Sequence, residues 1–331
     1  MTGVAVLTIT LFTTGINAAE FNKVCFQDSV QHYEPGKHYV FKVTSPTGEF
    51  ANGIEYIAGD AKSRLILTSP HGGDLRPEFM HTRTKEFVVT ANDNDYGDTE
   101  SFASVADTKT LELTEELANE IKQTTGLRPH IILNHLHRSK LDANRAMSLA
   151  AQGDKNAEAA WKAFHQYIDD AKKQVAINGD GLVLDIHGNA HRPQRTEVGL
   201  LLKSKDFTAG DLESFADKSS VRAMVKSGKA TMTELIKGEF ALGTLLNNNG
   251  VVATPSKSIP NPIDPQIFPD GKYFNGGYNT ARHGSKFSGN VSAIQLEFNG
   301  DVRVNDAKRG EYVKSISKVI NQFMNKYFYQ L

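Results

Sequence analysis

The 331-residue chain contains a single cysteine, Cys25, and this scarcity excludes an intrachain disulfide. A lone thiol is most often a small, buried apolar side chain, so we give Cys25 no catalytic role. Stability therefore has to come from the packing of a core and from any bound metal.

The chain also lacks an excess of charge of either sign. Its 37 Lys and Arg residues nearly balance 38 Asp and Glu residues, which gives a formal net charge of −1 at pH 7. No run rich in Lys and Arg interrupts this balance. We therefore expect no nucleic-acid partner and no membrane held by bulk charge.

The apolar run at 4–12 is too short to span a bilayer. It has the length of the apolar part of a secretory signal, and small residues follow it at Ala18-Ala19. We expect residues 1–19 to be a signal peptide cleaved near this point, leaving 20–331 as one secreted domain. A buried N-terminal strand is the alternative interpretation.

Four apolar segments, 64–68, 130–133, 181–184 and 291–294, are typical of buried strands. Further strands are expected at 39–44, 53–57 and 198–202, and helices at 110–124, 154–175, around 210–227, 231–238 and 307–328. Residues 81–106 and most of 244–290 are polar and irregular. Strands alternating with helices predict a three-layer α/β/α domain with a mostly parallel or mixed twisted sheet. Such a sheet places its chemistry at the carboxyl ends of its strands.

Candidate metal ligands follow two of these strands. His71 stands in a Pro-His-Gly-Gly turn with Asp74 three residues later, a spacing that can point an imidazole and a carboxylate at one ion. His187 ends a nearly apolar strand, and Asp185 is suitably placed to orient its ring if the strand stays regular. Each histidine, taken alone, is also compatible with a purely structural role.

Two more clusters carry charge to the same edge of the sheet. Glu297 closes an apolar strand, where a buried carboxylate beside a zinc-bound water would act as a general base and then as an acid. Arg138, Asn144 and Arg145 can polarise a scissile carbonyl and bind a substrate carboxylate. A solvated strand end for Glu297 and helix-start positions for the others are the structural alternatives.

Taken together and in this order, the clusters resemble the N-formylglutamate amidohydrolase family, which is related to aspartoacylases and zinc carboxypeptidases. The matching segments are His71-Gly72-Gly73-Asp74, Arg138 to Arg145, Asp185 to His187 and Gln295 to Glu297. Residues 276–284 also look like the glycine-rich active-site loop of that family. The resemblance covers roughly residues 60–300 and implies a domain of the zinc-exopeptidase, phosphorylase/hydrolase-like type.

The resemblance implies a role for each matched residue. His71, Asp74 and His187 would bind Zn²⁺, Glu297 would be the base and Arg138 would polarise the carbonyl. The substrate-binding residues would be Asn144, Arg145, Gly277, Tyr278 and His283. Related enzymes often have Glu where Asp74 stands, and Glu78 is the alternative ligand.

We therefore expect a secreted, zinc-dependent amidohydrolase that cleaves an amide bond in a carboxylate-bearing substrate such as an N-formyl or N-acyl amino acid. A zinc carboxypeptidase or a hydrolase of glutamyl polymers is the alternative within the enzymes. A secreted binding protein without activity is a second alternative, and a phosphate-binding or phosphorylase-like protein a third. The oligomeric state is left open.

Overall fold

The computed structural model describes residues 32–87, 96 and 101–329. From Tyr33 onward they belong to one compact unit built on an eight-stranded sheet. The strands are β1 His38–Thr44, β2 Phe50–Ile57, β3 Leu65–Ser69, β4 His130–Asn134, β5 Gly181–Gly188, β6 Thr196–Gly199, β7 Ala253–Thr254 and β8 Val291–Phe298. The expected signal peptide and Cys25 lie outside the described residues.

The longest described helices are α1 Thr110–Thr125, α3 Lys155–Ala176 and α9 Asp306–Tyr327. The shorter ones are α2 Met147–Ala151, α4 Arg222–Lys226, α5 Met232–Lys237, α6 Leu242–Asn248, α7 Tyr278–His283 and α8 Gly300–Arg303, with 3₁₀ turns at Ser204–Thr208 and Glu213–Lys218. The helices predicted at 110–124, 154–175 and 307–328 are thus confirmed to within a residue or two.

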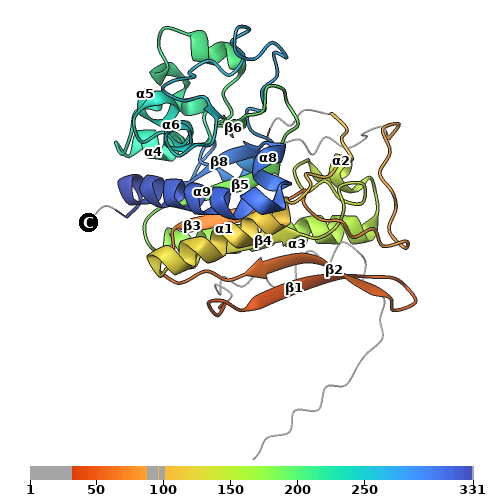
Figure 1. Cartoon of the computed structure of the whole chain (residues 1–331). Coiled ribbons are helices and arrows are strands. Elements are labelled where there is room, and N and C mark those ends of the chain that lie inside the picture. The colour runs from red at the N-terminus through yellow and green to blue at the C-terminus, as the bar shows by residue number, and fades with distance from the viewer. Residues whose placement is uncertain (1–31, 88–95, 97–100, 330–331) are drawn as a thin grey trace, which may run out of the picture. The chain divides into compact units, whose positions relative to one another are not determined.

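The middle of the sheet is parallel, and its flanks are antiparallel. The spatial order is β1-β2-β4-β3-β5-β8-β6-β7 (Figure 1). β4, β3, β5 and β8 run parallel to one another, whereas β2 pairs antiparallel with β1 and β4, and β6 pairs antiparallel with β8. The central strands are buried along their whole length because helices cover both faces. The predicted α/β class with a mixed sheet is confirmed.

The helices form two outer layers. α1 and α9 lie side by side over one face of the sheet (Figure 1), where Leu117 and Ile316 share a buried cluster with Leu184. α3 covers the other face, where Phe164 packs in a second cluster with Val183. The alternation of side chains along each strand separates the two clusters, so the architecture is three-layered.

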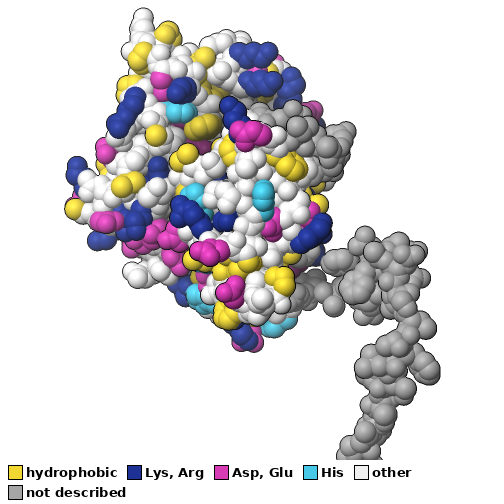
Figure 2. All heavy atoms as spheres, turned by 90° about the vertical axis from the view of Figure 1, so that its right-hand side faces the viewer, with side chains coloured by type: hydrophobic (Ala, Val, Ile, Leu, Met, Phe, Trp, Pro, Cys, Tyr) yellow, Lys and Arg dark blue, Asp and Glu magenta, His cyan; other side chains and the backbone are white. Residues whose placement is uncertain are grey.

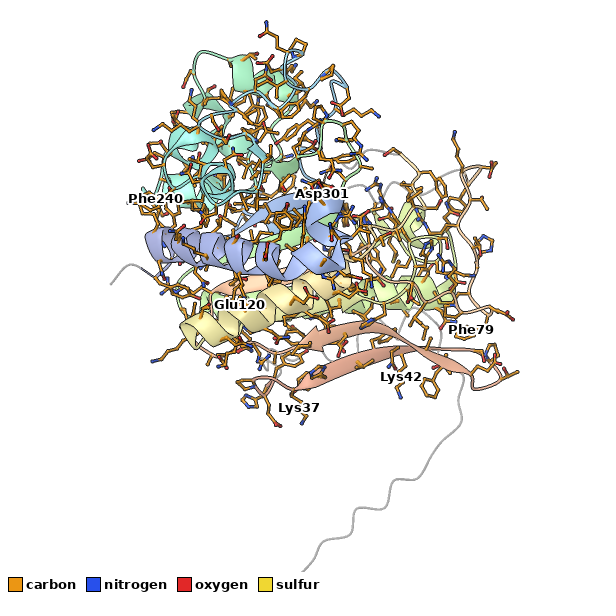
Figure 3. The ribbon with its side chains drawn as sticks, viewed as in Figure 1. Lys37, Lys42, Phe79, Glu120, Phe240 and Asp301 are labelled. Atoms are coloured by element: carbon orange, nitrogen blue, oxygen red, sulfur yellow. The ribbon has the colours of Figure 1, made fainter. Side chains whose placement is uncertain are left out.

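The edge strand β1 carries its own protection against pairing with another chain. It stands at one end of the strand order, so one row of its backbone groups has no partner strand among the described residues. Lys42 in this strand is exposed and points away from the sheet (Figure 3). A lysine at an open edge disfavours addition of a further strand.

Two predicted elements differ from the structure. The strand expected at 198–202 is Thr196–Gly199, because Leu201 has a left-handed φ of 65° that ends the extended chain. The helix expected around 210–227 is divided into a 3₁₀ turn and α4. Ser219 separates them, since its backbone is extended and its hydroxyl donates to Leu200 O at 3.0 Å.

Acidic and basic side chains are interspersed on the face shown in Figure 2, with no broad field of one sign. This mixed surface agrees with the near-neutral composition. Among the described residues, no helix combines the length and the apolar character needed to cross a membrane.

Candidate metal centre

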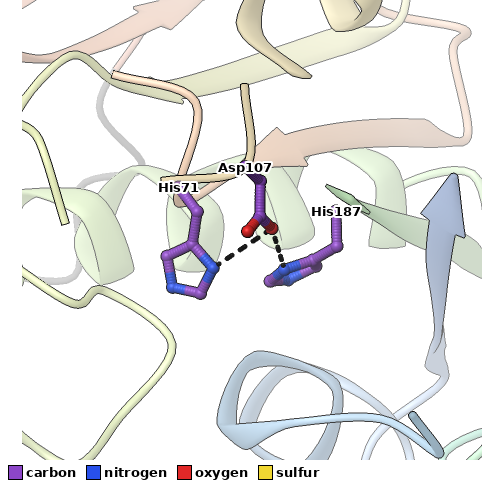
Figure 4. A group of neighbouring side chains, drawn as sticks. All are labelled: His71, Asp107 and His187. Atoms are coloured by element: carbon purple, nitrogen blue, oxygen red, sulfur yellow. Dashed lines mark hydrogen bonds and ion pairs between the residues drawn. The ribbon is translucent and has the colours of Figure 1, made fainter. Parts of the chain in front are cut away.

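Three side chains from distant parts of the chain meet at the carboxyl end of the parallel strands. His71 follows β3, His187 stands near the end of β5, and Asp107 lies three residues before α1. All three are buried, and their ligand atoms lie within 4.8 Å of one another (Figure 4). Asp107 Oδ2 is 3.4 Å from His71 Nδ1 and 3.1 Å from His187 Nδ1. Two imidazole nitrogens and one carboxylate oxygen therefore face a single point.

Each histidine is held from behind by another carboxylate. His71 Nε2 lies 2.6 Å from Asp142 Oδ1, and His187 Nε2 lies 2.8 Å from Asp185 Oδ2. An ionised carboxylate can only accept, so each Nε2 carries a hydrogen, and in a neutral ring the lone pair is then on Nδ1. Those lone pairs face Asp107, and His71 Nδ1 is a buried nitrogen with no hydrogen-bond partner. This donor set fits a divalent cation between the three atoms.

The strand period explains why the polar side chains converge. β5 stays regular over Gly181–Gly188, so Val183, Asp185 and His187 point to one face. On β8, Gln295 and Glu297 stand beside Asp185 and His187 in the parallel register and point to that face as well. Toward the carboxyl end this face therefore changes from apolar to polar. The orienting role predicted for Asp185 agrees with this geometry.

Buried negative charge surrounds the two imidazoles. Burial opposes ionisation of Asp107, but its contacts with His187 and His71 outweigh burial and hold the pKa of its carboxyl well below the ordinary value. Burial acts likewise on Asp142, and the nearby Arg138 guanidinium and His71 keep the pKa of that carboxyl low. For His187, burial lowers the pKa, but Asp185 and Asp107 outweigh it and raise the pKa well above the ordinary value. Because several buried carboxylates stay ionised here, a positive charge has to balance them, either a proton on His187 or a bound metal ion.

Glu297 lies beside this centre. It is 5% exposed, and its Oε1 is 3.9 Å from His187 Nδ1 and accepts a 2.8 Å hydrogen bond from Gln295 Nε2. Burial raises the pKa of Glu297 to about 8, with His187 opposing the rise and Asp107 adding to it. A carboxyl that exchanges its proton near neutral pH is suited to general acid–base work.

Arg138 contacts two carboxylates of the centre. Its Nε donates to Asp142 Oδ2 at 2.8 Å, and its Nη1 is 3.9 Å from Asp107 Oδ1. Burial lowers the pKa of Arg138, but these two carboxylates more than offset it, so the guanidinium stays charged. Asp142 thus holds the guanidinium next to the centre.

Asp74 is not part of the centre, and in this the structure corrects the sequence-based ligand set. A side chain at Gly73 would meet the backbone of His135 at 2.2 Å, because the chain leaving the turn packs directly on the segment after β4. Leu75 then forms a parallel bridge with Leu136, which turns Asp74 out to solvent. Glu78, the alternative ligand, is exposed too. Asp107 supplies the carboxylate instead.

Asn144 and Arg145 both lie close to the centre, but much of their hydrogen-bonding capacity is used within the protein. Asn144 Oδ1 accepts from Asn279 N at 2.8 Å, and its Nδ2 is 3.4 Å from His187 Nε2. Arg145 donates from Nε to Ser101 O at 3.1 Å and from Nη1 to Asn144 O at 2.7 Å. Asn144 therefore connects the metal centre to the start of α7.

The glycine-rich loop reaches the centre through Gly277 and Asn279, whose Nδ2 lies 3.5 Å from Asp185 Oδ1. A Cβ on Gly277 would lie 2.4 Å from Asn144 Nδ2, so the close packing of these two residues requires glycine. Tyr278 is 2% exposed, and its hydroxyl accepts from Arg282 at 3.2 Å. His283 is fully buried, with Nε2 2.8 Å from His165 Nδ1, and lies outside the metal group.

Two residues of the centre, Asp107 and Asp142, were not among the predicted site residues. Asp142 stands inside the Arg138-to-Arg145 motif, and its acidic character next to two arginines was a usable signal. Asp107 ends a long polar stretch just before α1, where an acidic residue usually indicates only a helix start. Only the folded structure shows that Asp107 lies beside His71 and His187.

Comparisons with known proteins show likeness to solved structures of amide-cleaving enzymes. The N-formylglutamate amidohydrolase from Ralstonia eutropha JMP134 is 10% identical with a TM-score of 0.44, covering 83% of this chain and 97% of that one. The succinylglutamate desuccinylase from Vibrio parahaemolyticus is 9% identical with a TM-score of 0.35, covering 87% and 67%. The N-acetylmuramoyl-L-alanine amidase AmiC2 of Nostoc punctiforme is 11% identical with a TM-score of 0.33, covering 80% and 97%.

No protein-family model matches the chain, and no curated protein matches it. The solved structures similar to this chain include an N-formylglutamate amidohydrolase, which bears the name of the family that the sequence motifs resemble. These likenesses are of low identity and low TM-score, and the function of this chain is inferred from the residues of the centre itself.

Proposed function

We propose that this protein is a zinc-dependent amidohydrolase that acts on an amide bond in a substrate bearing a carboxylate. The observation that carries the proposal is the convergence of His71 Nδ1, His187 Nδ1 and Asp107 Oδ2 on one point, each imidazole being oriented from behind by a carboxylate. A set of two imidazoles and one carboxylate is typical of catalytic zinc sites, which keep further positions open.

His71, Asp107 and His187 would hold the metal. When bound, zinc supplies a lowered pKa for a coordinated water and a Lewis acid for the carbonyl oxygen. The orienting carboxylates of Asp142 and Asp185 keep both Nδ1 lone pairs directed inward, so the ligands need no rearrangement before binding.

Glu297 would move the protons of the reaction. Its buried carboxyl takes a proton from the attacking water as the ionised base and returns it to the nitrogen of the leaving amine. The 2.8 Å hydrogen bond from Gln295 fixes Oε1, so Glu297 presents a defined orientation on the His187 side of the centre. Arg138, held by Asp142, donates hydrogen bonds to the oxygen on which negative charge develops.

Arg145 and Asn144 are the proposed contacts for the substrate carboxylate. Gly277 allows the start of α7 to pack closely on Asn144, and we assign Tyr278, the next residue, to the lining of the substrate site. His283 would act only indirectly, through the packing of α7. We further propose that the protein is exported, on the basis of the signal-like segment at 1–19.

The first test is metal analysis of the purified protein combined with a hydrolysis assay. The panel holds N-formyl- and N-acyl-amino acids, C-terminal dipeptides and poly-γ-glutamate, each assayed before and after treatment with a chelator. We expect about one zinc per chain and cleavage that the chelator abolishes and zinc restores. Zinc without cleavage would favour the binding-protein alternative, and failure to bind zinc after reconstitution would refute the proposal.

A further inference from the structure

A second buried polar cluster adjoins the metal centre across the last strands of the sheet. Glu197 of β6 is the direct antiparallel partner of Glu297 of β8, and directly opposed residues point to the same face. Glu197 therefore lies on the face that carries the proposed base, one strand further toward the sheet edge. Its side chain has no solvent exposure.

Both oxygens of the Glu197 carboxylate have partners within the protein. Oε1 accepts from His191 Nδ1 at 2.8 Å and lies 3.0 Å from Arg195 Nε, and Oε2 accepts from Phe274 N at 2.7 Å. Arg195 is fully buried and pairs with Asp270 at 3.0 Å. In this cluster Glu197 and Asp270 contribute two negative charges and Arg195 one positive charge.

His191 is the member of the cluster whose ring is held in place and still reaches solvent. Its side chain is 11% exposed, and its Nδ1 is used by Glu197. Phe274 stacks on the ring with centroids 4.5 Å apart and planes at 24°, which fixes the ring plane. His191 Nε2 makes no hydrogen bond to any described residue, and this atom is not fully buried. The ring thus has a fixed plane, and Nε2 is the nitrogen that can still bind a further group.

We propose that His191 is a further substrate-binding residue, which donates a hydrogen bond from Nε2 to a carboxylate of the substrate on the β6 side of Glu297. This inference deepens the proposed function and rests on it. The ring then lies between the carboxylate of Glu197, which accepts from Nδ1, and that of the substrate. Glu197 and Phe274 are positioning residues, because they act only through the ring of His191.

Chemical protection tests the contact without requiring turnover. Diethyl pyrocarbonate acylates accessible histidine nitrogens, and peptide mapping reports each site separately. His38 serves as the internal control, because its Nδ1 also contacts a glutamate, Glu55, at 2.5 Å, while its 58% exposed side chain lies on the edge strand β1. We expect saturating N-formyl-L-glutamate or L-glutamate to slow modification of His191 at least several-fold and to leave His38 unchanged.

Kinetics of a matched pair of variants provide the second readout. His191→Asn keeps an amide donor near Glu197 but has no atom at the place of Nε2, and His38→Asn makes the same change far from the centre. A hydrogen bond to a charged group corresponds to a loss of roughly 10-fold or more in affinity. We expect KM to rise by about that factor for His191→Asn, with kcat and zinc content nearly unchanged, and no change for His38→Asn.

The outcomes separate this inference from the proposed function. Protection of His191 without hydrolysis of any panel compound supports the contact and refutes the amidohydrolase. Hydrolysis with unprotected His191 and an unchanged KM in His191→Asn overturns the contact and leaves the amidohydrolase standing. If the variant loses zinc or melts at a much lower temperature than the wild type while protection is absent, His191 is structural and the inference is wrong.

Discussion

Replacing Asp107 by asparagine tests the identity of the third metal ligand. The change removes a charge from the oxygen that lies 3.4 and 3.1 Å from the two imidazole Nδ1 atoms. The amide oxygen can still accept from Gly188 N, which now donates to Asp107 Oδ2 at 3.0 Å, so the fold should persist. Loss of a carboxylate that merely orients a ligand weakens metal binding by about 10–100-fold. For a direct ligand we expect at least about 100-fold.

This loss has a thermal signature. With free zinc at about 1,000 times the wild-type Kd, binding contributes about 4 kcal/mol, and a 100-fold weaker Kd leaves about 1.4 kcal/mol. At roughly 2 °C per kcal/mol for a domain of this size, the zinc-induced rise in Tm falls from about 8 °C to about 3 °C. Differential scanning calorimetry with and without zinc measures both rises, and competition with a chromophoric chelator measures Kd.

Asp74→Asn is the matched control, because Asp74 is the ligand that the sequence motif predicts and the structure exposes. It should retain the wild-type Kd and the full rise in Tm. The reasoning is refuted if Asp107→Asn binds zinc like the wild type, and most clearly if Asp74→Asn is the variant that loses it.

Three further predictions concern the base, the glycine-rich loop and the response to acid. Glu297→Gln should keep zinc and lose about 10²–10⁴-fold in kcat, and near-normal turnover with zinc bound would exclude its role. Gly277→Ala should lower kcat/KM sharply, because the new Cβ would lie 2.4 Å from Asn144 Nδ2, whereas Gly210→Ala, with no atom within 4 Å, should be silent. Burial lowers the pKa of His130 to about 4, so the unfolded chain takes up this proton first as the pH falls from about 6.5 to 4. Urea titrations at pH 7 and 4.5 should show a loss of stability that is larger by about 2.4 kcal/mol in the wild type than in His130→Gln, and equal losses would argue against it.

Much of the fold could be predicted from local patterns. The predicted long helices end where their capping residues stand: Asp154 accepts from Ala157 N at the start of α3, and Gly126 adopts a left-handed φ of 76° after α1. These signals are local, so a sequence contains them in full. The short helices α6, α7 and α8 were not predicted, because packing rather than a long periodic pattern stabilises segments of four to seven residues.

The metal centre was predictable in part, and the reason differs from residue to residue. His71 and His187 each terminate a buried strand, and Arg138 and Glu297 stand in clusters that follow or close strands as well. The order of strands in the sheet then brings these ends together. His283 shows the opposite case, since its place in a motif does not reveal that α7 turns its ring away toward His165.

By itself, the sequence determined which side chains the strands carry to one edge and one face of the sheet. The two-residue period of a regular strand makes Asp185 and His187 neighbours whatever else the chain does. The choice of Asp107 over Asp74 belongs to the tertiary structure. It follows from the contact of Gly73 with the backbone at His135, which turns Asp74 outward, and from the path of the chain into α1, which brings Asp107 between the two histidines. Contacts between segments that are distant in sequence leave no periodic trace, so only the folded chain decides them.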